Sequence, residues 1–172
     1  MRRLALFAVL LLASSSCFGQ QPATAKATSG PSEVKIGGAV ATPFSVSLED
    51  LKKMPRKTLH VENAHAKKME VYEGVPLDAL LHKAGVPQGE QLRGAGMATY
   101  VLVGAADNYH VLFSLAELDP SFQDSEVLLA DTMDGAPLAS DQGPFKLVAP
   151  HEKRPARWVK MVASITVGRA TD

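Results

Sequence analysis

Residues 99–113 read TYVLVGAADNYHVLF, and this stretch predicts two strands joined by a turn. Residues 99–103 form a nearly continuous apolar run, which is typical of a strand buried on both faces. Residues 105–108 carry the turn-forming pair Asp-Asn, and residues 109–113 have the composition of a second strand. The middle of the chain is therefore predicted to be a β-hairpin.

The flanking sequence predicts further short strands and a few short helices. Ser47 and Ser114 are suitable N-caps for two of the helices, and Pro76 suits the first position of a third. The chain is therefore predicted to be an α+β domain, mostly β, spanning residues 33–168, with residues 169–172 as a tail. The further predicted strands are residues 34–36 (an edge strand), 58–62, 69–72, 127–130, 145–149 and 159–167, and the predicted helices are residues 48–53, 77–84 and 115–118.

The composition suits one ordinary domain. The chain has 172 residues, 46% of them hydrophobic, which is enough for a core. Lys and Arg number 18 and Asp and Glu number 18, so the basic excess of a nucleic-acid-binding protein is missing. We therefore expect no nucleic-acid partner.

The N-terminal sequence predicts export. Residues 1–19 have two arginines, a ten-residue apolar run and then small residues, which is the layout of a cleaved signal peptide. The run is too short for a transmembrane segment, and no other stretch is long enough. We expect a periplasmic or secreted protein in which residues 20–32, rich in small and polar residues, form a flexible linker. A lipid anchor on Cys17 is the alternative, but Ser14 stands where lipoprotein leaders normally carry Leu.

Common catalytic motifs are missing from the sequence. It contains no GxSxG, HExxH, P-loop or GxGxxG pattern. Cys17 is the single cysteine, and none of the five histidines forms an HxH or HxxxH pair. We therefore predict no catalytic residue and no protein-held metal from these patterns.

The densest group of basic side chains lies near the C-terminus, where residues 150–160 read PHEKRPARWVK. Guanidinium and ammonium groups of this kind bind anions and phosphates. A solvated loop before the last strand is the alternative interpretation. The candidate ligand-binding residues of this segment are Lys153, Arg154, Arg157, Trp158 and Lys160.

Three more candidates lie elsewhere. Asp107 and Tyr109 belong to the predicted turn, where they could line the mouth of a pocket or simply form the turn. His65 lies in the polar connection between residues 62 and 69.

The order of several short motifs resembles a known family. The chain is similar to the oxidoreductase molybdopterin-binding domain, which is the fold of the sulfite oxidase family, and most of all to its short, exported, single-domain branch. The resemblance covers residues 33–168 and implies a mixed α+β fold with much β-sheet. It is carried by residues 72–77 (YEGVPL), 80–87 (LLHKAGVP), 107–109 (DNY), 114–118 (SLAEL), 127–130 (VLLA), 135–138 (GAPL), 143–150 (GPFKLVAP) and 157–167 (RWVKMVASITV).

The resemblance also implies where a cofactor would lie. In family enzymes a cysteine thiolate binds molybdenum, upstream of the segment that matches residues 72–81. Here residues 59–69 contain no cysteine, and His65 stands near the expected place with a different kind of donor. Asp107 to Tyr109 matches the family's Asp-Gly-Tyr turn with Asn108 in place of Gly, and residues 157–160 match the segment near the pterin. The resemblance therefore makes a molybdenum-molybdopterin cofactor possible, although the missing thiolate predicts none.

Three hypotheses follow. The first is a non-catalytic module that binds a small anionic ligand or an envelope protein through Asp107, Tyr109 and the basic residues. The second is a periplasmic molybdenum-cofactor oxidoreductase, with the metal held by the pterin alone or with help from His65. The third is an accessory role in the cell envelope, tethered by residues 20–32. The missing thiolate favours the first.

Overall fold

A computed structural model describes residues 30–63, 67–124 and 126–170. The predicted signal peptide, Cys17, most of the predicted linker and His65 lie outside the described residues.

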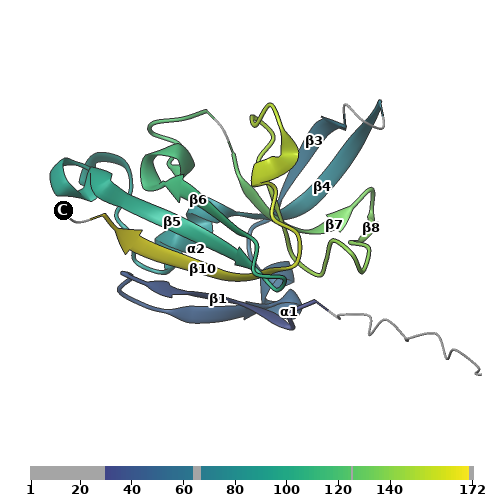
Figure 1. The fold of residues 1–172 in the computed structure, drawn as a ribbon, viewed down its shortest axis with the longest axis horizontal. Helices are drawn as coiled ribbons and strands as arrows, with labels where there is room; N and C mark the ends of the chain where they lie inside the picture. The colour runs from purple at the N-terminus through teal and green to yellow at the C-terminus, as the bar shows by residue number, and fades with distance from the viewer. Residues whose placement is uncertain (1–29, 64–66, 125, 171–172) are drawn as a thin grey trace, which may run out of the picture.

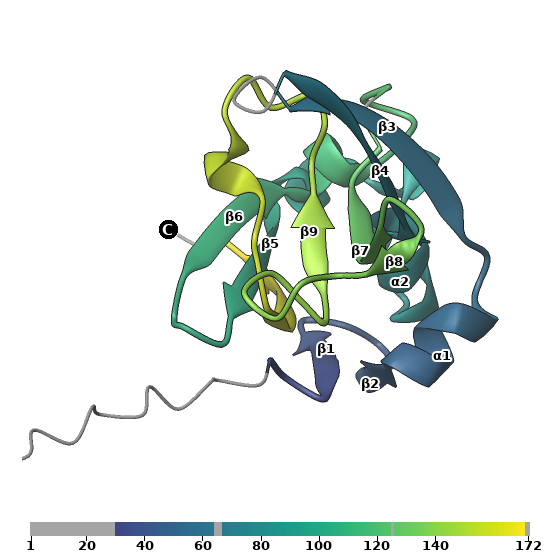
Figure 2. The same ribbon diagram turned by 90° about the vertical axis from the view of Figure 1, so that its right-hand side faces the viewer.

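The described residues form two five-stranded sheets (Figures 1 and 2). The first sheet has the order β2-β1-β10-β5-β6, and the second has the order β3-β4-β7-β8, with β9 also paired to β7. This confirms the prediction of a mostly β domain of the α+β type. The strands are β1 Glu33–Gly38, β2 Phe44–Ser47, β3 Lys57–Asn63, β4 Lys68–Pro76, β5 Thr99–Ala105, β6 His110–Ser114, β7 Leu128–Met133, β8 Ala136–Pro137, β9 Lys146–Val148 and β10 Val162–Arg169.

Short helices connect the strands. Ser47 and Ser114 cap α1 and η3 as predicted, each in a reciprocal capping box with an acidic residue three positions later. Pro76 is not the first helical residue, because it still belongs to β4 and stands at the N-cap of α2. The described helices are α1 Leu48–Lys53, α2 Leu77–Lys83 and the 3-10 turns η1 Gly89–Gln91, η2 Gly94–Ala98, η3 Leu115–Leu118 and η4 Pro155–Arg157.

The predicted central hairpin is confirmed, with Leu102 directly opposite Leu112. Asn108 has a φ of +67° at its turn, a conformation that Asn tolerates better than most residues. The prediction that this strand is buried on both faces is wrong. The burial of β5 alternates, with Leu102 half-buried, because no described element covers the outer face of the first sheet (Figure 1).

Two strand predictions need correction. β1 is not an edge strand, because it lies between β2 and β10. The last strand begins at Val162 rather than at residue 159, because Met161 has a φ of +48° and breaks the extended run. Neither feature is visible in local sequence, since both depend on segments far apart in the chain.

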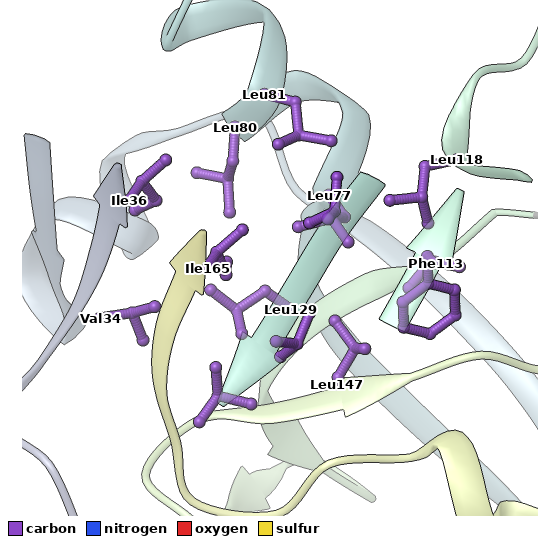
Figure 3. Close-up of a cluster of buried hydrophobic side chains, with 14 of the residues drawn as sticks. Val34, Ile36, Leu77, Leu80, Leu81, Phe113, Leu118, Leu129, Leu147 and Ile165 are labelled. Atoms are coloured by element: carbon purple, nitrogen blue, oxygen red, sulfur yellow. The ribbon is translucent and has the colours of Figure 1, made fainter. Parts of the chain in front are cut away.

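The main core lies between the first sheet, α2 and the second sheet (Figure 3). Leu77, Leu80 and Leu81 project from one face of α2 into it, as their spacing predicts. A smaller cluster, made by Val61, Tyr72, Leu128, Ala130 and Val148, lies on the second sheet and packs against Trp158. Trp158 therefore lies against this smaller cluster, and its neighbour Arg157 contacts the edge strand β6.

Candidate functional site

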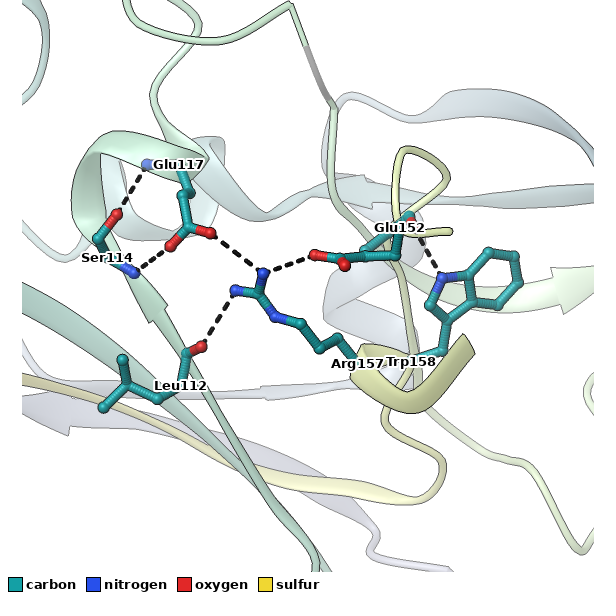
Figure 4. A network of polar contacts seen from close by, with 7 residues as sticks. Leu112, Ser114, Glu117, Glu152, Arg157 and Trp158 are labelled. Carbon is teal, nitrogen blue, oxygen red and sulfur yellow. Dashed lines mark hydrogen bonds and ion pairs between the residues drawn. The ribbon is translucent and has the colours of Figure 1, made fainter. Parts of the chain in front are cut away.

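Arg157 is the centre of a polar network that joins three segments of the chain (Figure 4). Its Nη1 donates to Glu152 Oε1 at 2.6 Å and to Glu117 Oε1 at 3.1 Å. Its Nη2 donates to the carbonyl of Leu112 at 3.1 Å, and its guanidinium lies 4.0 Å from the ring centroid of Phe113. The charge of this predicted anion-binding residue is therefore already paired with two carboxylates. We call Arg157, Glu117 and Glu152 the Arg157 network.

Glu117 is held in place by the capping box of η3. The backbone N–H of Ser114 donates to its Oε2 at 2.6 Å. Burial disfavours the ionised form of Glu117, but the hydrogen bonds from Ser114 and Arg157 outweigh burial and lower its pKa. This glutamate is therefore ionised in its pair with Arg157 at neutral pH.

A pocket of about 180 Å³ lies beside the Arg157 network. Its apolar walls are Phe113, Val127, Ala149 and Pro150. Its polar walls are Glu117, Gln123, His151 and Glu152. The pocket wall thus holds two carboxylates, one imidazole and an aromatic ring, and no lysine or arginine of the segment lines it.

Trp158 and Tyr109 hold the same segment from two sides. The indole N–H of Trp158 donates to the carbonyl of Ala149 at 2.7 Å, and its ring meets that of Tyr72 edge-on at 5.8 Å. The hydroxyl of Tyr109 donates to the carbonyl of Ala156. Asp107 accepts the backbone N–H of Tyr109 at 3.0 Å, which is ordinary turn chemistry.

The remaining basic candidates lie on the surface. Lys153, Arg154 and Lys160 are exposed, and no ion pair among the described residues involves them. The structure therefore divides the predicted site into an internally paired Arg157 and three solvated cations.

Sequence reasoning missed a buried polar group on β9. Lys146 is 6% exposed and donates to the hydroxyl of Tyr72 at 2.9 Å and to Gln142 Oε1 at 2.7 Å. Tyr72 in turn donates to Glu70 at 2.8 Å. Burial, partly opposed by Glu70, lowers the pKa of Lys146 to about 8, and burial raises the pKa of Tyr72. The signal was a lysine within the apolar stretch FKLVA. We call Glu70, Tyr72, Gln142 and Lys146 the Lys146 network.

Comparison with known proteins agrees with this architecture. The family model described as "Oxidoreductase molybdopterin binding domain" matches residues 23–172. The chain belongs to this family. No curated protein matches the chain.

A solved structure similar in fold to this molybdopterin-binding domain is the sulfane dehydrogenase SoxCD from Paracoccus pantotrophus. The two sequences are 23% identical and the structures superpose with a TM-score of 0.62. The match covers 78% of this chain and 37% of the SoxCD chain. The likeness shows a shared fold. The matched region amounts to little more than a third of the SoxCD chain.

The donor set of the described residues does not match a thiolate-bound metal. The only cysteine of the sequence, Cys17, lies outside them. Among the described residues no group of three or more His, Cys, Asp or Glu side chains is placed to hold a metal ion. Cations near the second sheet already have protein partners, since Arg56 pairs with Asp131 at 2.6 Å and Lys146 lies within its own network. The described residues of this molybdopterin-binding domain therefore contain no cysteine thiolate that could bind a metal.

The described residues contain no helix of the length and hydropathy that a membrane crossing requires.

Proposed function

We propose that this chain is an exported, non-catalytic binding domain of the molybdopterin-binding family. The observation that carries the proposal is the donor set, because the sequence after residue 19 contains no cysteine. Loss of a thiolate removes both an anchor and a charge that tune a bound metal. The fold is retained, and the segment 149–160 supplies its binding surface.

The exposed cations are the part of this surface that favours an anion. Lys153, Arg154 and Lys160 lie in one short segment and have no ion pair within the described chain. An anionic small molecule, or an acidic patch on an envelope protein, would therefore meet unpaired positive charge. Arg157 acts differently, because it fixes the segment against β6 and η3.

Metal and pterin analysis tests the non-catalytic part of the proposal. The full chain is expressed with its leader in a host that makes the molybdenum cofactor, and the purified protein is assayed for molybdenum and pterin. We expect less than a few per cent occupancy. Stoichiometric molybdenum and pterin would overturn the proposal and support a molybdenum-cofactor oxidoreductase.

Phosphate binding tests the anion surface. We expect inorganic phosphate to bind the purified protein weakly and to lose about tenfold in affinity when Lys153 and Arg154 are both replaced by Ala. Lys35→Ala removes an exposed positive charge from β1 and serves as the control. Equal phosphate affinity in all three proteins would remove the anion surface from the proposal.

Export is tested on the same preparation. We expect the periplasmic or secreted protein to begin near residue 20 by mass spectrometry. A cytoplasmic protein that retains residue 1 would overturn this part, and a lipid mass on Cys17 would replace a free domain with an anchored one.

A further inference from the structure

We infer that the pocket beside the Arg157 network binds a small organic cation, such as a primary amine or a guanidinium compound. This goes beyond the proposed function, which places an anion on the outer cations of the segment. The pocket is a separate concave site, and its two carboxylates, Glu117 and Glu152, have the opposite charge to the outer cations.

The pocket wall contains more negative than positive charge from the Arg157 network. Glu117 and Glu152 both face Arg157, so two carboxylates share one guanidinium and leave an excess of one negative charge. Both also line the pocket. Oε1 of Glu152 accepts from Arg157, whereas the described residues provide no hydrogen-bond donor to its Oε2. A ligand that enters the pocket therefore meets an unshared carboxylate oxygen, which an ammonium group can pair.

The aromatic ring of Phe113 also favours a cationic ligand with an alkyl chain. The Phe113 ring already has one cation on its face, since the Arg157 guanidinium lies 4.0 Å from its centroid. Phe113 also lines the pocket, together with Val127 and Pro150. These apolar side chains suit the short alkyl chain of an alkylamine. An anion would instead approach two carboxylates at close range, which costs free energy.

The size of the pocket limits the ligand. A volume of about 180 Å³ is below the roughly 300 Å³ at which sites for drug-sized ligands begin. The expected ligand therefore has few heavy atoms, with one cationic group and a short chain.

Trp158 provides a built-in reporter for binding. It is the only tryptophan of the chain, and its indole N–H donates to Ala149, which forms part of the pocket wall. The purified full chain is titrated with n-butylamine, butylguanidine, n-butanol and sodium phosphate, with Trp158 fluorescence and calorimetry as readouts. We expect saturable binding of the two cations and none of butanol at the pocket.

Three variants locate the site. Glu152→Gln keeps the shape of the side chain and removes its charge, so it should weaken amine binding about tenfold. Gln123→Arg places a tethered cation at an exposed position of the pocket wall and should weaken amine binding in the same way. Glu62→Gln removes an exposed carboxylate from β3 and should leave binding unchanged.

The inference is overturned if neither cation binds the wild-type protein, or if Gln123→Arg and Glu152→Gln both bind amines as tightly as the wild type. It is also overturned if butanol binds as tightly as butylamine. Phosphate binding that the double replacement of Lys153 and Arg154 abolishes is assigned to the outer cations. The phosphate titration therefore tests the anion surface, and the amine titration tests the pocket independently. Should Glu152→Gln fail to fold, Gln123→Arg decides the result.

Discussion

Arg157 and Glu152 form a 2.6 Å ion pair across only five residues of sequence, and the same nitrogen of Arg157 also pairs with Glu117, 40 residues away. The pair with Glu152 links two residues within the segment 149–160. The pair with Glu117 attaches that segment to η3. A third bond, from Arg157 to the Leu112 carbonyl, occupies an acceptor on the edge strand β6. One guanidinium thus occupies a backbone acceptor at the sheet edge and holds two carboxylates of the pocket wall in place.

Replacement of Arg157 by Leu should destabilise the protein by about 2 kcal/mol, because it removes one hydrogen-bond donor from each of two carboxylates and from a backbone carbonyl. Urea denaturation at neutral pH measures the free energy of unfolding. Arg154→Leu removes the same chemical group from an exposed position without an ion pair, and should change stability by less than about 0.5 kcal/mol. Similar losses in the two variants would show that Arg157 is a surface residue like its neighbour.

A second ion pair fixes the second sheet. Both terminal nitrogens of the Arg56 guanidinium donate to the carboxylate of Asp131, whose side chain is 2% exposed. Asp131→Ala should cost about 3 kcal/mol, because the partly buried guanidinium then loses the carboxylate that it hydrogen-bonds. Lys57 and Glu126 form an exposed pair nearby, so Glu126→Ala should cost less than about 1 kcal/mol. Chemical denaturation of both variants checks the difference, and equal losses would contradict it.

Local patterns predicted the hairpin at residues 99–113, both serine caps and the apolar face of α2, because each depends on neighbouring residues. The interior place of β1 depends on β2 and β10, and the end of the extended run at Met161 depends on contacts with residues 142 and 145. The amino-acid composition of residues 150–160 was enough to predict a basic segment. Its division into paired and solvated cations could not be predicted, because Glu117 lies 40 residues from Arg157. Lys146 was missed for the same reason, since its partner Tyr72 lies 74 residues away.

Gly74 should tolerate no side chain. It lies at an irregularity in the pairing of β4 with β7, where an added Cβ would come within 2.1 Å of the Leu129 carbonyl. Gly74→Ala should therefore destabilise the protein by at least about 2 kcal/mol, as overpacking against a backbone does. Thermal or urea unfolding measures the loss, and failure of the variant to fold is the extreme form of the same result.

Gly37 provides the matched control for Gly74. It also lies within a strand, but an added Cβ would meet no atom within 4 Å. Gly37→Ala should leave stability unchanged or slightly increased. Equal free energies of unfolding for the two alanine variants would refute the close approach of β4 to β7 at Gly74.

The Lys146 network should make stability rise with pH above about 8. The ordinary pKa of lysine is 10.5, and burial lowers that of Lys146 to about 8 in the folded protein, with Glu70 and Asp141 opposing the shift and Lys160 adding to it. Between these two values the unfolded chain binds a proton that the folded chain has released, so unfolding becomes less favourable as pH rises. The contribution is at most about 1.4 kcal/mol per pH unit. Below pH 8 both states are protonated and the contribution is flat.

Tyr72 sets the upper limit of this rise. Its pKa is raised in the folded protein, so above about pH 10 the unfolded chain loses the phenolic proton first and stability falls. Urea denaturation of the wild type from pH 7 to 10 should therefore show an increase that Lys146→Met abolishes and that the exposed control Lys35→Met retains. A wild-type curve without a rise, or a Lys146→Met curve with the same rise, would mean that the buried ammonium keeps its proton at the ordinary pKa.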